Sequence, residues 1–194
     1  RARSDKKTIV LPESTDIRTV QAASMIIKRG IAHIVLVGDR DKIYELAGDL
    51  DLTGVTIVNP NSSDKFEDYA NTFYEMRKLK GVTPEQARET MKNPLYWGVM
   101  MVKKGEADGM VAGAINSTAN TLRPALQILK TAPGTKLVSA FFIMAVPDCE
   151  YGQGGVFLYA DSGLVENPNA DELSEIAISS AKTFKKLVEA EPRV

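Results

Sequence analysis

Short apolar runs alternate with helix-forming segments through the first half of the chain, and this alternation limits the possible folds more than any other feature. Three of these runs are short and rich in β-branched side chains: Thr8–Leu11, residues 31–38 and residues 55–58. The second run is apolar on both faces. Residues 17–29 carry apolar side chains at helical spacing, and Gly30 follows as a suitable helix end. Because parallel strands are usually joined by a crossover helix, the pattern predicts a three-layer α/β/α fold with a mostly parallel sheet.

Additional helices precede the fourth predicted strand. Further helices are expected at residues 39–48, 65–80, 84–91 and 95–104. Thr83 and Gln86 form the pattern of a capping box, with Pro84 between them at the first helical position. A strand is then expected from Ala107 onward. Ligand sites in sheets of this kind lie at the carboxyl ends of the strands, so the segment that follows Ala107 is a candidate site.

The pattern changes after a break at residues 132–134, where alanine, proline and glycine follow one another. Residues 137–146 and 156–160 both resemble strands and lie too close together to enclose a helix, so they predict an antiparallel hairpin. An amphipathic helix follows from Asp171 to Val188. We therefore predict a first α/β domain at 1–133 and the start of a second at 134–194. That second domain is expected to be incomplete, because a strand should follow such a helix.

Composition excludes several classes of protein. The 194 residues include 24 Lys and Arg against 25 Asp and Glu, which argues against a broad nucleic-acid-binding face. A single cysteine, Cys149, excludes an internal disulfide framework and lacks the partners for a zinc site, and no metal is expected. No apolar run reaches the roughly 20 residues that cross a membrane, and the N-terminus does not resemble a signal peptide. A cytoplasmic location is the resulting expectation.

Residues 107–124 combine a short strand, a polar loop and the start of a helix. We expect Thr121 to cap that helix, with Arg123 in its first turn. Asn116, Ser117 and Thr118 crowd the loop beside small residues that allow a ligand to approach the backbone. Free N–H groups at a helix start attract anions, and an arginine adds a bidentate cation. These residues predict a phosphate or acyl-phosphate pocket, against the simpler alternative of a capped helix with a surface arginine.

Other candidate residues have simpler interpretations. Residues 152–155 contain three glycines but precede a strand, so they predict a hairpin turn and not a nucleotide-binding loop. His33 lies within an apolar strand, where a structural histidine is expected. Arg77 ends a basic helical segment, where it would offset the helix dipole. Asp161 follows a strand and fits turn chemistry.

Four stretches together resemble the phosphate acetyl/butyryltransferase family. They are residues 10–13 with Arg18, residues 73–78, residues 108–128 and residues 160–173, in the family's order. The resemblance covers the whole chain. It implies a two-domain α/β enzyme with a fold similar to isocitrate and isopropylmalate dehydrogenases, a cleft between the domains, and a homodimer at full length.

The resemblance also implies a reaction, the reversible transfer of an acetyl group between CoA and phosphate. The CoA thiolate attacks the carbonyl carbon of acetyl phosphate, and phosphate leaves. Arg123 matches the family's active-site arginine and Arg77 a second arginine on the CoA or phosphate side. Ser117, Thr118 and Thr121 match as phosphate ligands, and Asn116 is added from its place in the loop. CoA, acetyl-CoA, phosphate and acetyl phosphate are substrates, and no cofactor, nucleic acid or membrane is implied.

Two alternatives remain open at this point. One is transfer of a longer acyl group, as in butyryl transfer, and the other is a non-catalytic anion-binding regulatory module like the related domain of some malic enzymes.

The family's thiol-activating groups, a serine–arginine pair and an aspartate, match nothing among the 194 residues. We therefore expect these residues alone to lack normal turnover.

Overall fold

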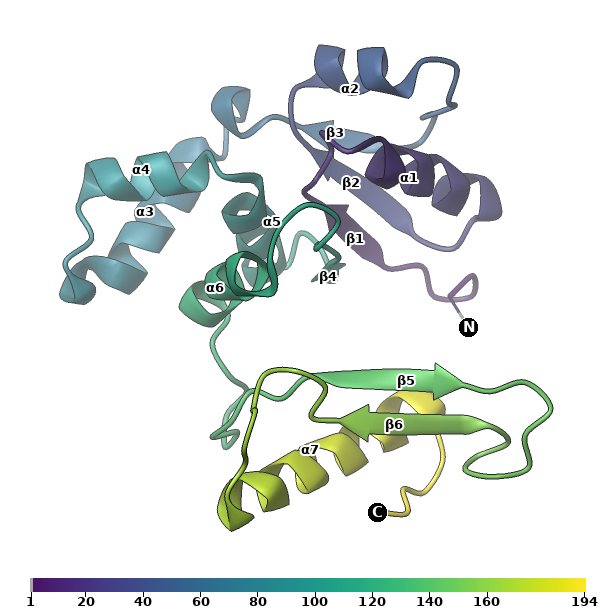
Figure 1. Ribbon diagram of the computed structural model, residues 1–194. Helices are drawn as coiled ribbons and strands as arrows, with labels where there is room; N and C mark the ends of the chain where they lie inside the picture. The colour runs from purple at the N-terminus through teal and green to yellow at the C-terminus, as the bar shows by residue number, and fades with distance from the viewer. Residues whose placement is uncertain (1) are drawn as a thin grey trace. The chain divides into compact units, whose positions relative to one another are not determined.

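The computed structural model describes residues 2–194 and contains two compact units (Figure 1). The first unit ends at Lys130 and the second comprises Thr131–Val194. Each unit has a sheet of its own, four-stranded in the first and two-stranded in the second. The two units are described separately below.

A parallel sheet forms the centre of the first unit. Its strands are β1 (Thr8–Leu11), β2 (His33–Val37), β3 (Thr56–Val58) and β4 (Gly109–Met110). They lie in the order β3-β2-β1-β4, and every neighbouring pair is parallel. The mostly parallel α/β sheet predicted from the sequence is therefore confirmed. The carboxyl ends of the adjacent strands β1 and β4 lie at the same edge of the sheet, which brings together the residues that follow them.

Helices cover both faces of this sheet. They are α1 (Ile17–Arg29), α2 (Arg40–Ala47), α3 (Phe66–Arg77), α4 (Pro84–Met91), α5 (Pro94–Lys103) and α6 (Thr118–Ile128), with short 3₁₀ helices at η1 (Pro60–Ser62) and η2 (Lys78–Lys80). Leu11 and Leu36 point to the side of α1 and α2, whereas Val10 and Val35 point to the side of α3 to α6. Alternating strand residues thus fill two apolar layers, and the unit has the predicted three-layer arrangement (Figure 1).

The ends of several helices agree with local sequence signals. Gly30 takes a left-handed conformation with φ 63° at the end of α1, a conformation that glycine adopts at little cost. Thr83 and Gln86 form the expected capping box at α4. Residues 78–80 differ from the expectation, because the predicted helix 65–80 ends as α3 at Arg77 and continues only as the 3₁₀ turn η2.

The second unit contains a hairpin and one helix. Strands β5 (Phe141–Ala145) and β6 (Val156–Ala160) pair antiparallel, with Phe141 opposite Ala160, and α7 (Ala170–Val188) packs on β6. The turn between the strands depends on glycine. Gly155 has φ 83°, and a Cβ there would collide with the Val146 carbonyl oxygen. Residues 152–155 therefore form the hairpin turn that the sequence predicts.

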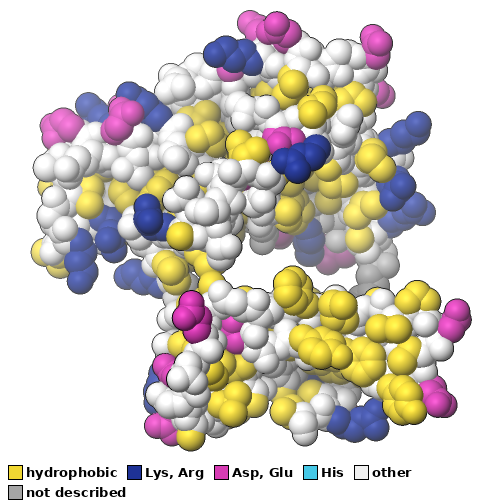
Figure 2. All heavy atoms as spheres, in the orientation of Figure 1, with side chains coloured by type: hydrophobic (Ala, Val, Ile, Leu, Met, Phe, Trp, Pro, Cys, Tyr) yellow, Lys and Arg dark blue, Asp and Glu magenta, His cyan; other side chains and the backbone are white. Residues whose placement is uncertain are grey.

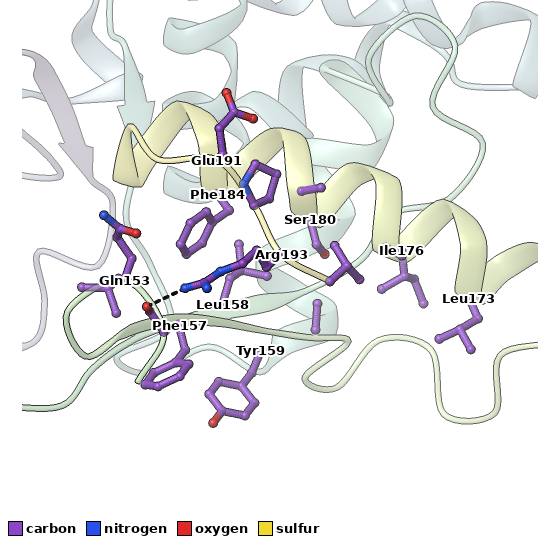
Figure 3. A pocket seen from close by; sticks show the side chains of 17 residues that line it. Gln153, Phe157, Leu158, Tyr159, Leu173, Ile176, Ser180, Phe184, Glu191 and Arg193 are labelled. Atoms are coloured by element: carbon purple, nitrogen blue, oxygen red, sulfur yellow. Dashed lines mark hydrogen bonds between the residues drawn. The ribbon is translucent and has the colours of Figure 1, made fainter. Parts of the chain in front are cut away.

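An apolar hollow of about 410 Å³ lies between α7 and the hairpin (Figure 3). Leu158 from β6 and Phe184 from α7 point into it, whereas Phe157 and Tyr159 point to the opposite side of the hairpin. That opposite side is open: Figure 2 shows apolar side chains gathered over β5 and β6, and Phe142 is 58% exposed. Within this unit α7 packs on β6, whereas every residue of β5 is exposed.

Burial in the first unit generates a stability prediction. Met100 on α5 is fully buried, whereas Met25 on α1 is 52% exposed. Met100→Ala should lower the free energy of unfolding by about 2–5 kcal/mol, because it removes buried methylenes and leaves a cavity. Met25→Ala is the matched control and should change it by less than about 0.5 kcal/mol. Urea unfolding of both variants measures the difference, and similar losses would contradict the assigned core.

Candidate functional site

Glu13 occupies the edge of the sheet where β1 and β4 end. It follows β1, and its side chain reaches the loop that follows β4, which comprises residues 111–117. Oε2 accepts the N–H groups of Gly113 and Ala114, each at 2.7 Å. Oε1 accepts the N–H groups of Ile115 at 3.1 Å and Asn116 at 2.9 Å, and the Asn116 side-chain amide at 2.8 Å. The buried carboxylate therefore holds four consecutive residues of the loop.

Consecutive backbone N–H groups that converge in this way form a nest of the kind that binds anions. In this chain the anion in the nest is the carboxylate of Glu13, which is only 4% exposed. The N–H groups of residues 113–116 are consequently not free for phosphate. A phosphate at this loop has to use the groups that follow it, in the first turn of α6 and beyond.

Hydrogen bonding keeps Glu13 ionised despite its burial. Burial by itself raises the pKa of this carboxyl, because the charged form loses its contact with water. The Asn116 amide and the N–H groups of Ala114, Ile115 and Asn116 outweigh that effect and lower the pKa to about 2. Glu13 is therefore a fixed negative charge at neutral pH.

Arg18 holds the same loop from a second direction. Its Nη2 donates to the Ala114 carbonyl oxygen at 2.8 Å and also pairs with Asp16 at 2.7 Å. Asp16 in turn caps α1, since its side chain accepts the Arg18 N–H. The start of α1 and the loop after β4 are thus joined through one guanidinium group.

Helix α6 begins earlier than the sequence predicts. Ser117 is its N-cap and accepts the Asn120 N–H at 3.3 Å, so the expected cap at Thr121 is wrong. Thr121 lies one turn inside the helix, and its hydroxyl oxygen is buried with no hydrogen-bond partner among residues 2–194. The residue directly before this cap, Asn116, is the last loop residue that Glu13 holds.

The charges of two arginines from different helices influence the pKa of one tyrosine, Tyr96. Arg123 is exposed on α6, and Arg77 is half-buried at the end of α3, with an Nε atom that has no hydrogen-bond partner in the described part of the chain. Burial raises the pKa of Tyr96, and the positive charges of Arg123 and Arg77 oppose that rise. The Tyr96 hydroxyl donates to Gln127 at 3.1 Å, one turn beyond Arg123. Both predicted arginines thus contribute positive charge at Tyr96.

The predicted ligands of the loop fall into two groups. Thr118 is exposed in the first turn of α6, beside the capping Ser117, whose hydroxyl oxygen already accepts a backbone bond. Asn116 differs, because its amide nitrogen is committed to Glu13. Sequence reasoning placed Glu13 only in a stretch that resembles the family, with no role of its own, and did not single out Tyr96. An acidic residue two positions after a predicted strand could have indicated Glu13, whereas nothing local distinguishes Tyr96.

Asp161 in the second unit acts on its own loop as Glu13 does in the first. Its carboxylate accepts N–H groups from Ala140 at 2.8 Å and from Gly163 and Leu164 at 2.7 Å each. Burial raises the pKa of Asp161, but these bonds outweigh it and hold the pKa well below its usual range. Asp161 is therefore a second ionised carboxylate that fixes a loop.

The remaining candidates have no comparable surroundings. His33 is exposed at the start of β2, and Cys149 is a half-buried free thiol. Within residues 2–194 no three His, Cys, Asp or Glu side chains are grouped to hold a metal ion. No helix over the same residues is long and apolar enough to cross a membrane.

Comparison with known proteins defines the family. A profile of the phosphate acetyl/butaryl transferase family matches residues 1–194, and the chain belongs to that family. It is 71% identical to the phosphate acetyltransferase of Acetivibrio thermocellus, over all of this chain and 58% of that protein. The phosphate acetyltransferase of Thermoanaerobacterium thermosaccharolyticum is 55% identical over all of this chain and 59% of its own length.

Solved structures agree with these relatives. A phosphotransacetylase from Streptococcus pyogenes matches with a TM-score of 0.88 at 37% identity, over 98% of this chain and 57% of that one. The EutD phosphotransacetylase from Staphylococcus aureus matches with a TM-score of 0.84 at 36% identity, over 94% and 54%. The chain thus spans little more than half the length of these relatives, which agrees with the incomplete second domain expected from the sequence.

The low pKa of Glu13 predicts a specific dependence of stability on pH. Its ionised form stabilises the fold above the unfolded-state pKa of 4.5, and that contribution is lost as the pH falls towards 2. The stability gap between the wild type and Glu13→Gln should therefore shrink by about 2 kcal/mol between about pH 6 and pH 3. Urea unfolding of the 194-residue chain at both pH values measures this gap.

Glu45→Gln, at an exposed position of α2, is the matched control. Its gap to the wild type should stay small at both pH values. A Glu13→Gln gap that does not change with pH would contradict the assignment of Glu13 as an ionised internal acceptor.

Proposed function

We propose that this protein is a phosphate acetyltransferase, which moves an acetyl group reversibly between CoA and phosphate. The observation that carries the proposal is the loop held by Glu13, which leads directly into α6, the helix that carries Arg123. Membership of the family and 71% identity to a phosphate acetyltransferase support the same activity. The match covers 58% of that relative, so the proposal concerns the gene product to which these residues belong.

The residues of the first unit suit the phosphate side of this reaction. When the CoA sulfur attacks the carbonyl carbon of acetyl phosphate, the carbonyl electrons move onto oxygen, and they return as phosphate departs. Guanidinium groups stabilise charge on phosphate oxygens through short, bidentate bonds. We assign this role to Arg123, which is exposed on α6 and makes no ion pair among the described residues.

The first turn of α6 supplies further donors. Thr118 and the N–H groups that follow Ser117 lie at the positive end of the helix dipole, where an anion is stabilised. Arg77 and Thr121 complete the proposed set, since each has a buried polar atom without a partner inside the described chain. Ser117 and Asn116 shape the site through the cap and the loop, beside any contact of their own with phosphate.

The finer properties follow the family. We propose acetyl-CoA, CoA, phosphate and acetyl phosphate as substrates, with no resident cofactor, in a cytoplasmic homodimer. The thiol-activating groups are assigned to none of residues 2–194. Acetyl transfer is favoured over butyryl transfer because the two relatives described above are both named phosphate acetyltransferases.

Replacing Arg123 tests this function in the full-length gene product. Arg123→Ala should lower kcat/KM for acetyl phosphate formation by about 10²–10³-fold, the usual cost of removing one donor to a developing charge. The rate of CoA release from acetyl-CoA in the presence of phosphate provides the measurement, and butyryl-CoA in the same assay tests the acyl preference.

Arg88→Ala is the matched control. Arg88 is an exposed arginine on α4 that pairs with Glu67 on the surface of the same unit. Its replacement should leave the rate unchanged. A wild-type protein that releases no CoA, or an Arg123→Ala variant with the wild-type rate, would refute the proposed function.

A further inference from the structure

We propose that Glu13 is a positioning residue for phosphate: its carboxylate sets the loop at residues 113–116, and through it the start of α6 and Arg123. This inference rests on the proposed function, because it names which substrate the loop serves. Glu13 itself touches no substrate in this account. It acts through the loop backbone, whose N–H groups it accepts at 2.7–3.1 Å.

The loop has few other contacts that could fix its shape. Gly113 takes a backbone φ of 110°, which residues with a side chain rarely adopt, and Ile115 is 57% exposed. Gly113 and Ala114 are exposed as well, so apolar packing contributes little to holding these residues. The carboxylate of Glu13, with Arg18 on the Ala114 carbonyl, is the main restraint that the structure shows.

The negative charge is essential to this restraint. An ionised carboxylate only accepts hydrogen bonds and has room for several donors, whereas a neutral amide presents two N–H donors of its own. The five hydrogen bonds to Glu13 use both carboxylate oxygens, two of them on Oε2 and three on Oε1. A glutamine at this position would turn an N–H group toward part of the loop, and the backbone there would have to move.

The restraint passes directly into α6. Asn116 is bonded to Glu13 through both its backbone and its side chain, and the next residue, Ser117, is the N-cap of the helix. Arg123 lies six residues beyond that cap, less than two turns into the helix. A shift of the loop therefore moves the phosphate-binding end of α6, and displacements of about 1 Å can cost 10²-fold in rate.

The same carboxylate also keeps phosphate out of the nest. Because Glu13 fills the nest with a negative charge, a second anion there would be repelled. Phosphate is left with the donors of α6 and the arginines. Glu13 would thus both orient the site and exclude an unproductive mode of binding.

Kinetics of the full-length gene product test the inference. Glu13→Gln should raise KM for phosphate by about 10–100-fold, with KM for acetyl-CoA within about twofold of the wild type. Glu13→Asp keeps the charge but shortens the side chain, and it should give a smaller rise in KM for phosphate. Partial rescue by the charged variant is the result that a role in packing alone would not produce.

Ser14→Ala is the matched control for a purely structural effect. Ser14 is 2% exposed and donates to the Val37 carbonyl oxygen at 2.6 Å, beside Glu13 in the chain. Its replacement should lower the unfolding midpoint and leave KM for phosphate unchanged. An unchanged KM for phosphate in Glu13→Gln, or equal rises for both substrates, would overturn the inference.

If the Glu13→Gln variant does not fold, the KM values of the Glu13→Asp variant test the inference instead. A selective rise in KM for phosphate supports the inference, and an unchanged or unselective KM overturns it. The wild-type rate separates this result from the proposed function: an active wild type with an unaffected Glu13→Asp refutes only the role of Glu13. An inactive wild type refutes the function and the inference with it.

Discussion

The candidate site depends on the hydrogen bonds that the carboxylate of Glu13 accepts. Burying a charge is costly unless hydrogen bonds replace the water it loses, and the loop after β4 supplies five of them. The parallel pairing of β1 with β4 makes this possible, because both strands end at the same edge. The sheet fixes Glu13, Glu13 fixes the loop, and the loop fixes where α6 begins.

In the function that we propose, the work at phosphate is divided between one internal anion, Glu13, and external cations. Glu13 occupies the backbone donors nearest the sheet, so the loop is ordered before any ligand arrives. Arg77 and Arg123, from two different helices, supply positive charge near Tyr96. Asp161 fixes a loop of the second unit in the same manner. Preorganisation of this kind lets charge be stabilised without rearranging the site during the reaction.

Local chemistry explains which parts of the structure could be predicted. The capping box at Thr83 and the glycine after α1 depend on residues only a few positions apart, and both are present as expected. The cap of α6 directly follows Asn116, which is bonded to Glu13 about a hundred residues earlier in the chain, and local preference wrongly chose Thr121 over Ser117. The influence of both Arg77 and Arg123 on Tyr96 likewise depends on three separate helices, which local sequence preferences do not reveal. The residue types of the site were visible in the sequence, but the contacts that organise them were not.

A crystal structure with phosphate bound tests the central claim most directly. The account predicts an anion that contacts the Arg123 guanidinium and the first turn of α6, with the Glu13 carboxylate still bonded to the N–H groups of residues 113–116. A phosphate seated in that nest with Glu13 displaced, or an anion bound elsewhere with Arg123 facing bulk solvent, would contradict it.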